Sequence, residues 1–348
     1  MTFHFLERHA NVTESPKAVV GVLTVLLTLT VLTAGQGQPA TPAGESPPAA
    51  TVAPSQLRIA ITVDDIPWNG SWPGGDTVNA STRKLIAVLA RHRAPVTVFV
   101  NCRPDEASRQ VLLAWVHAGA SVGNHTTGHR DLNSTPPQEW ADAVRACDHA
   151  LRSAVRSPIR YFRYPGLHQG QTIAERNAAI RVLNELGYRN APVTIDNSDF
   201  LVAAPYLRAT RAGDALARRK FGALMVEHDS AATEHSRAVA RALLGRDVAH
   251  ILLLHSNLMT ADNLDRLLTT LEVLGAHFVS LDEALTDPVY AQPNRYTGAK
   301  GLSWLYRVDP SLPTQLPAAA RWDDAEAARV RAAIRGIESF RRSQRGSL

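Results

Sequence analysis

The sequence predicts an α/β protein with a single domain, built as a distorted or incomplete (β/α) barrel of about seven parallel strands. Apolar, β-branched runs of strand length alternate along the chain with longer runs of helical period. Polar residues collect at the C-terminal ends of the strand-like runs, which is where (β/α) barrels build their sites. No glycine-rich nucleotide-binding motif follows the first strand, so a nucleotide site is not indicated.

Each of the seven predicted strands is an apolar, β-branched segment that ends in polar residues or a turn. They are residues 57–65, 94–101, 120–124, 159–163, 188–199, 250–255 and 277–281. The predicted helices lie between and after them, and several stop at a glycine, the residue most often found just beyond a helix end. They are residues 82–92, for which Ser81 is the expected cap, then 110–118, 137–155, 174–186, two helices within 201–244, 264–274 and a charged helix at about 323–342.

Composition divides the 348 residues into four parts. Residues 1–34 contain the uncharged run 18–34 and are typical of a cleaved signal peptide, with an uncleaved membrane anchor as the alternative. Residues 35–56 form a Pro/Ala-rich linker with too few apolar residues to fold. Residues 57–290 form the domain, and 291–348 a packing strap followed by the charged helix. We therefore expect an exported protein, periplasmic or extracellular, that meets a membrane only through an uncleaved N-terminal segment.

The formal charge of +5 comes mostly from scattered arginines that are not interleaved with aromatic residues. This distribution is typical of a solvated surface, and we expect no nucleic-acid partner. The oligomeric state has no signal in the sequence.

Two cysteines, Cys102 and Cys147, would be exported together and could pair in an oxidising compartment. Pairing requires their Cα atoms to come within about 7 Å, which a sequence does not reveal. Two buried free thiols are the favoured interpretation, and a disulfide is the alternative.

Two adjacent carboxylates, Asp64 and Asp65, end the first strand, and two histidines, His125 and His129, follow the third. Histidines at this spacing can reach one divalent ion. No glutamate lies between them to act as a base, so one aspartate could complete a three-ligand site while the other accepts a proton. Taken alone, such a carboxylate pair is more often a helix cap or a solvated turn, and such histidines more often have core or surface roles.

A second polar group also contains residues of metal-ligand type. It comprises Glu227, His228, Asp229, Glu234 and His235. Because it falls inside a predicted helix and away from the strand ends, we expect it to form a solvated helix face.

Five segments occur in the order and approximate spacing of the five motifs of the polysaccharide deacetylases, carbohydrate esterase family four. They are TVDDIP from Thr62, HTTGH from His125, RYPG from Arg163, DNSDF from Asp196 and LLLH from Leu252. The chain resembles this family over about Leu57 to Tyr290. The resemblance implies metal-dependent hydrolysis of N-acetyl groups on an amino-sugar polysaccharide, with attack by metal-bound water. It also implies an acetylated glycan as partner and one divalent ion, with Zn²⁺ the first expectation and Co²⁺, Ni²⁺ or Mn²⁺ as alternatives.

The resemblance assigns the polar residues at the strand ends to distinct roles. It implies that Asp65, His125 and His129 bind the metal, that Asp64 is the general base and that Arg163 holds Asp64. These roles fit the chemistry, because a bound metal lowers the pKa of water from 15.7 to about 7.

The resemblance assigns oxyanion stabilisation and protonation of the leaving amine to residues of the later motifs. His255 is implied as the general acid for the leaving amine, with Asp199 orienting it. The backbone N–H of Tyr164 would stabilise the oxyanion, and Leu253 would form a wall of the acetyl pocket. An amine is a poor leaving group, so an acid that titrates near neutral pH suits this step.

The sequence departs from the family motifs at three positions that bear on the substrate groove. Ile66 replaces a usual glycine, Gly166 closes its motif one residue early, and Phe200 replaces a usual tryptophan. Trp68 and Trp72 follow the first motif and could form a sugar-stacking platform, although packing is the commoner role of loop tryptophans.

Two other functions stay open. An O-acetyl esterase acting on an acetylated glycan such as xylan needs less help at the leaving group. A non-catalytic glycan-binding scaffold would keep the fold without turnover, but the intact set of ligand, base and acid residues argues against it. Chitin-like, cell-wall peptidoglycan, exopolysaccharide and xylan substrates all fit these motifs.

Overall fold

The structure is a computed structural model that describes residues 56–312 and 323–345, and these lie in one compact unit. The expected signal segment and nearly all of the linker fall outside the described residues, so their predictions stay predictions. Within the described ranges, no helix is both long and apolar enough to cross a membrane.

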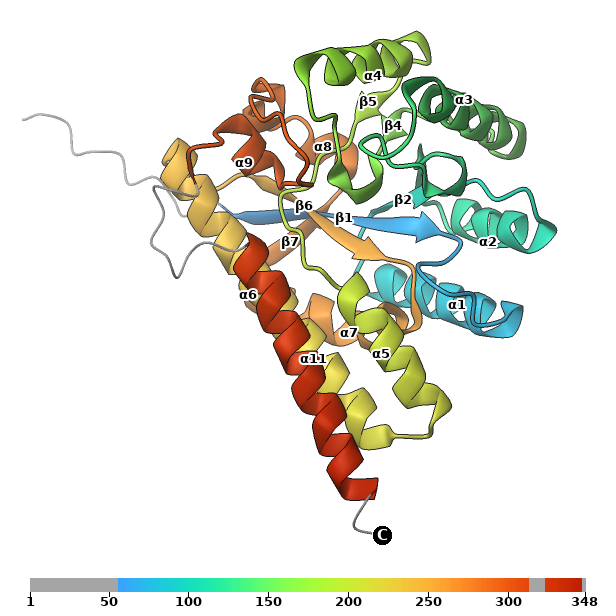
Figure 1. Cartoon of the computed structure of the whole chain (residues 1–348), viewed down its shortest axis with the longest axis vertical. Coiled ribbons are helices and arrows are strands. Elements are labelled where there is room, and N and C mark those ends of the chain that lie inside the picture. Colours follow the sequence, from blue (N-terminus) through green and yellow to red (C-terminus); the bar gives the residue numbers. More distant parts are fainter. Residues whose placement is uncertain (1–55, 313–322, 346–348) are drawn as a thin grey trace, which may run out of the picture. The chain divides into compact units, whose positions relative to one another are not determined.

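Parallel strands curl into an incomplete barrel at the centre of the unit (Figure 1). The order is β5-β4-β3-β2-β1-β6, and β7 pairs with the N-terminal half of β1. The N–H groups of Thr194 and Ile195 donate to the carbonyl of Ile251, which joins the segment after β5 to β6. The predicted fold class is confirmed. The strands are β1 Leu57–Ile66, β2 Val96–Val100, β3 Ser121–Asn124, β4 Tyr161–Phe162, β5 Arg189–Asn190, β6 Ala249–His255 and β7 Ala276–Val279.

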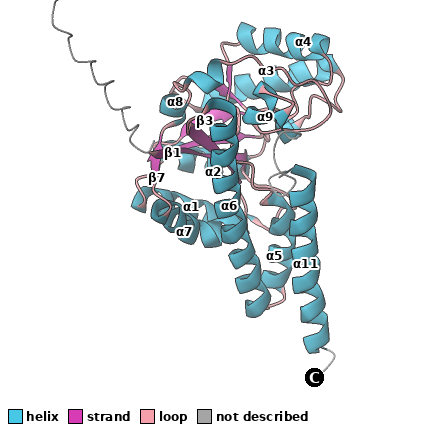
Figure 2. Ribbon diagram, turned by 90° about the vertical axis from the view of Figure 1, so that its left-hand side faces the viewer, coloured by secondary structure: helices cyan, strands magenta, loops and turns pink. Residues whose placement is uncertain are grey.

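Helices cover the outside of the sheet, and α5, α6 and α11 extend together away from the strands (Figure 2). The α-helices are α1 Gly75–Arg91, α2 Glu106–His117, α3 Pro137–Ala154, α4 Ile173–Glu185, α5 Phe200–Arg211, α6 Ala215–Leu244, α7 Leu258–Val273, α8 Leu281–Ala284, α9 Trp304–Val308 and α11 Asp323–Arg345. Three short 3₁₀ turns are η1 Thr127–His129, η2 Pro165–Leu167 and η3 Pro288–Ala291.

The central strand β1 fixes the position of the site. Ile59, Ile61 and Val63 are at most 1% exposed, and burying each such side chain contributes about 1.5–3 kcal/mol. β1 runs parallel to β6 with Asp64 in register with His255. The apolar part of the strand therefore anchors the sheet, and its polar end meets the polar end of β6.

Two predicted helix features differ from the structure. Helix α1 begins at Gly75, so Ser81 lies inside the helix, where it is buried against the core rather than capping the helix. The charged helix α11 contacts α5 and α6 and buries Val330 and Ile334, so it is not simply solvated. Because its apolar positions recur at helical spacing, one face can pack while the charged face remains in water.

Cys102 and Cys147 form a disulfide with their Cα atoms 5.2 Å apart, so the favoured interpretation of free thiols is wrong. Cys102 lies two residues beyond the end of β2, and Cys147 lies on the buried face of α3. That helix packs against β3, the neighbour of β2, which brings the two cysteines together.

The second polar group lies on α6, as expected, but only part of it is solvated. Glu227 and Glu234 are exposed, whereas His228 is buried and Asp229 is 0% exposed. His228 pairs with Glu326 of α11, and α6 packs against the helices α5, α7, α9 and α11, which accounts for the buried part of this group.

Candidate active site

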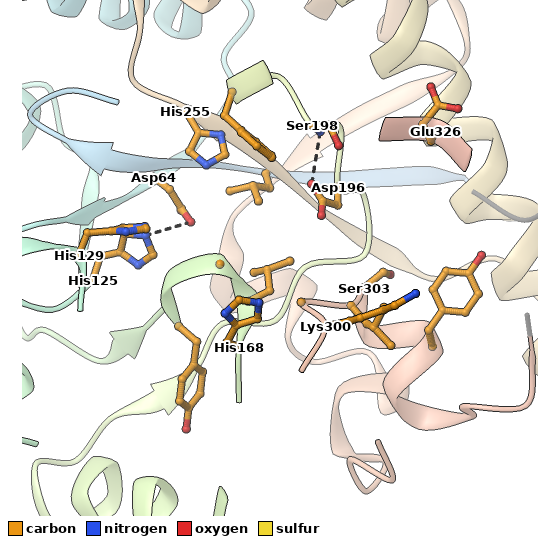
Figure 3. Close-up of a pocket in the computed structure, with 18 residues that line it drawn as sticks. Asp64, His125, His129, His168, Asp196, Ser198, His255, Lys300, Ser303 and Glu326 are labelled. Carbon is orange, nitrogen blue, oxygen red and sulfur yellow. Dashed lines mark hydrogen bonds and ion pairs between the residues drawn. The ribbon is translucent and has the colours of Figure 1, made fainter. Parts of the chain in front are cut away.

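A cavity of about 440 Å³ lies at the C-terminal ends of the strands. Its lining includes Asp64 from β1, His125 and His129 from the segment after β3, Tyr164 from the segment after β4 and His255 from β6 (Figure 3). Four segments far apart in the chain therefore contribute polar groups to one cavity, as expected for this fold class.

Asp65, His125 and His129 form a group whose ligand atoms all lie within 4.8 Å of one another. The Oδ1 atom of Asp65 is 3.7 Å from Nε2 of His125 and 3.5 Å from Nε2 of His129. Nδ1 of His125 lies 2.7 Å from the carbonyl oxygen of Arg163, which accepts its hydrogen and leaves the Nε2 lone pair toward the group. One carboxylate and two imidazoles fit a divalent ion with an open coordination position.

Two asparagines that the sequence analysis did not single out hold the carboxylate of Asp65. Asn69 donates to Oδ2 at 2.6 Å, and Asn101 donates to Oδ1 at 2.9 Å. Asn101 directly follows the buried strand β2, so a polar residue at a strand end was the available signal.

The charge environment keeps Asp65 ionised. Burial raises its pKa, but the charges of His255, His125 and His129 and the bond from Asn69 lower that pKa to about 2. Burial lowers the pKa of His125 to about 4, so this imidazole is neutral near pH 7 and can offer a lone pair. Both groups are thus in the protonation state that metal binding requires.

The backbone around these groups adopts conformations that are unusual for non-glycine residues. Asp65, Thr126 and His129 have φ angles of 64°, 64° and 57°. Such left-handed conformations cost of order 1–3 kcal/mol and cluster at functional sites.

Asp64 is paired with Arg163, and both residues are buried. Nη1 of Arg163 lies 3.3 Å from each carboxylate oxygen, Nη2 donates to Thr62 Oγ1 at 3.1 Å, and Nε donates to the carbonyl of Ala191 at 2.6 Å. Burial lowers the pKa of Arg163, and the charge of Asp64 opposes that effect. These hydrogen bonds fix the orientation of the guanidinium, and its Nη1 group contacts both carboxylate oxygens of Asp64.

His255 is oriented by Asp199. Nδ1 of His255 lies 2.5 Å from Oδ1 of Asp199, and the backbone N–H of His255 donates to Oδ2 at 2.9 Å. Thr260 also donates to Oδ2, at 3.3 Å. Burial lowers the pKa of His255, but the charge and hydrogen bond of Asp199, followed by the charges of Asp65 and Asp64, raise it to about 10.

Three other predicted site residues differ in where they lie relative to the cavity. Tyr164 lines the cavity, and within the described residues its backbone N–H donates to no acceptor. Leu253 lines the cavity and packs with Leu167 and Val193. Trp68 is only 3% exposed and belongs to the hydrophobic core, and it also lines an adjoining cavity of about 170 Å³, so its stacking role stays a prediction.

Three comparisons with known proteins bear on this arrangement. Residues 51–191 match the family model "Polysaccharide deacetylase". Chitooligosaccharide deacetylases from Bradyrhizobium sp. and Sinorhizobium fredii are 34% and 32% identical over 85 residues, which is 24% of this chain. The chain spans about 39% and 40% of the length of these curated relatives. A pseudoenzyme of carbohydrate esterase family 4 from Bacillus anthracis shows a TM-score of 0.49 at 16% identity, covering 67% of this chain and 66% of that one.

Proposed function

This chain belongs to the polysaccharide deacetylase family, and we propose that it is a metal-dependent hydrolase that removes N-acetyl groups from an amino-sugar glycan. One observation carries the proposal. The group of Asp65, His125 and His129, the Asp64–Arg163 pair and the His255–Asp199 pair all gather around one cavity. A solvated acidic patch would not need a buried arginine on one carboxylate and a buried carboxylate on the histidine.

The proposed reaction divides proton transfer between two residues. Asp64, held by Arg163, accepts a proton from the water that attacks the acetyl carbon. The backbone N–H of Tyr164 donates a hydrogen bond to the oxygen that becomes negative. His255 then donates its Nε2 proton to the amide nitrogen as the C–N bond breaks, which releases acetate and a free amine.

Asp65, His125 and His129 would hold the cation, and Leu253 would pack against the acetyl methyl group. A divalent ion at this position would lower the pKa of the attacking water and polarise the acetyl carbonyl. The two-histidine, one-carboxylate donor set favours Zn²⁺, and Co²⁺, Ni²⁺ and Mn²⁺ accept similar donors.

The Cys102–Cys147 disulfide supports the further proposal that the protein works outside the cytoplasm, because disulfides persist in oxidising compartments. Cell fractionation followed by detection of the full chain tests this. Recovery mainly in the cytoplasmic fraction would contradict it.

The central experiment measures acetate release by the metal-loaded protein from N-acetylated oligosaccharides and from acetylated xylan. We expect release from the first panel, and Asp64→Asn should lower kcat by about 10²- to 10⁴-fold while the metal affinity changes little. Release from acetylated xylan alone would replace the proposal with an O-acetyl esterase. No release from either panel, with metal bound, would favour a non-catalytic scaffold.

A further inference from the structure

The Cys102–Cys147 disulfide begins at the residue next to one that holds the candidate metal group. Cys102 follows Asn101, and the side chain of Asn101 donates to Oδ1 of Asp65 at 2.9 Å. The same Oδ1 atom lies 3.7 Å and 3.5 Å from the Nε2 atoms of the two histidines. One end of the disulfide is therefore the immediate neighbour of the residue that orients this oxygen.

The backbone of Asn101 contacts both segments that carry the metal-ligand residues. Its N–H donates to the carbonyl of Ile66 at 2.8 Å, and its carbonyl accepts from the N–H of Gly128 at 3.0 Å. Ile66 follows Asp65, and Gly128 lies between the two histidines. A displacement of Asn101 would therefore disturb hydrogen bonds to both segments.

Cys102 depends on the disulfide for its position. Its φ of 40° is uncommon for a residue with a side chain, and such conformations persist only where the surrounding structure holds them. Among the described residues, the N–H and carbonyl of Cys102 make no hydrogen bond to the backbone. Cys147 is 0% exposed on α3, which packs against β3. The disulfide therefore anchors the segment after β2 to a packed helix.

A small dithiol can reach this disulfide. Cys102 is 8% exposed and lines a cavity of about 300 Å³, whose other lining residues include members of α2 and α3. A thiolate that enters this cavity can attack Sγ of Cys102, and Sγ of Cys147 leaves and takes up a proton.

The second thiolate of the reductant then attacks the reductant's own sulfur in the mixed disulfide. Sγ of Cys102 leaves and takes up the second proton of the dithiol, which departs as a cyclic disulfide. The carbonyl oxygen of Val100 lies 3.4 Å from Sγ of Cys147, and that of Cys147 lies 3.6 Å from Sγ of Cys102. Both new S–H groups therefore have an acceptor in the folded protein.

We propose that the Cys102–Cys147 disulfide controls the metal affinity of the site: the oxidised protein holds Asn101 against Asp65, and reduction releases Asn101 and weakens metal binding. This inference rests on the metal site of the proposed function and adds a regulation of that site. A chain with free thiols, as in a reducing compartment, would hold the metal ion weakly, and formation of the disulfide would complete the site.

The first test compares the Zn²⁺ affinity, measured by calorimetry, of the full chain with its disulfide intact and of the Cys102→Ala/Cys147→Ala variant. The variant has no thiols that could bind the ion themselves. We expect about tenfold weaker binding, because loss of a contact that orients a metal ligand costs about 10- to 100-fold in affinity. Equal affinity would overturn this inference and leave the metal site intact. Absence of Zn²⁺ binding by both proteins would overturn the metal site of the proposed function as well.

The second test determines whether the effect passes through Asn101. In an Asn101→Ala background, removal of the disulfide should change the Zn²⁺ affinity by less than about threefold. Asn69→Ala is the matched control, because Asn69 donates to the other oxygen of Asp65 at 2.6 Å. It should weaken binding but leave the effect of the disulfide at about tenfold. General destabilisation would act in both backgrounds, so an effect that persists without Asn101, or disappears without Asn69, would refute the proposed route.

The third test uses the unmodified chain and remains decisive if the double variant does not fold. Dithiothreitol without denaturant should reduce the disulfide, which mass spectrometry detects as two alkylated cysteines. After removal of the reductant without oxygen, Mn²⁺, which prefers oxygen ligands to thiolates, should bind about tenfold more weakly than to the oxidised protein. A disulfide that stays intact, an unchanged Mn²⁺ affinity, or loss of the near-ultraviolet circular dichroism of the folded protein on reduction would overturn the proposed control.

Discussion

Replacing Asp199 by asparagine should lower the pKa of His255 and move the alkaline limb of the pH–activity profile to lower pH. Burial lowers the pKa of His255, and the charge of Asp199 is the largest of the influences that raise it to about 10 from 6.5. A cation bound by Asp65 would offset part of the carboxylate charge near His255. The contribution of Asp199 would persist, because Asp199 lies behind the histidine at 2.5 Å from Nδ1.

The size of the effect follows from the protonated fraction of His255. Asparagine keeps an oxygen that can accept the Nδ1 hydrogen but carries no charge. If the pKa returned to 6.5, about 1% of the molecules would keep the proton at about pH 8.5. A step that requires protonated His255 would then slow about 100-fold at that pH, with a much smaller loss near pH 6.

The assay is acetate release across about pH 5 to 11, paired with NMR titration of ¹³C-labelled histidine in the metal-free protein, which does not depend on activity. Thr260→Val is the matched control, because it removes a hydrogen bond to Asp199 Oδ2 without changing any charge. Its alkaline limb should stay in place. An unchanged alkaline limb in Asp199→Asn, together with an unchanged His255 titration, would refute the assignment of Asp199 as the residue that tunes His255.

Three further predictions follow from buried contacts. Arg163→Met leaves the buried carboxylate of Asp64 without its partner and should lower the free energy of unfolding by about 3–5 kcal/mol in urea titrations; an unchanged midpoint would contradict the pairing. Replacing both Cys102 and Cys147 by alanine removes a cross-link between residues 45 apart in sequence and should lower the free energy of unfolding by about 4 kcal/mol. The difference between wild type and the double variant should disappear under reducing conditions. Asn101→Ala frees one oxygen of Asp65 and should weaken metal binding about 10- to 100-fold by calorimetry; equal affinity would show that Asn101 does not orient the ligand.

The sequence predicted the fold class and the convergence of the motifs for one physical reason. In parallel α/β sheets the C-terminal ends of the strands lie together, so polar residues at those ends must meet. Asp64, Arg163 and His255 were found in this way. Asp64 and His255 line one cavity, and Arg163 is hydrogen-bonded to Asp64.

Features that depend on packing between distant segments carried no comparable signal. The burial of Trp68 and the pairing of Cys102 with Cys147 depend on which helix faces cover the sheet, and the period of a helix does not specify its partner. The segment that begins at residue 291 was predicted to pack as a strap. Lys300 and Ser303 of this segment line the cavity, and Arg307 ties it to the carbonyl of Leu167, a contact that no side-chain pattern reveals. Backbone acceptors have the same chemistry at every position, so their use cannot be inferred from residue type.

The neighbouring carboxylates Asp64 and Asp65 illustrate how local backbone geometry determines chemistry. In a regular strand, adjacent side chains point to opposite faces, so two consecutive aspartates could not both serve one cavity. Here the register of β1 with β2 shifts between Val63 and Ile66, and Asp65 adopts a φ of 64°. Asp64 keeps its place opposite His255 while Asp65 is turned toward its own hydrogen-bond donors. This irregularity in β1 allows Asp64 to contact Arg163 while Asp65 lies beside two histidines. Two adjacent aspartates can therefore have different chemical roles.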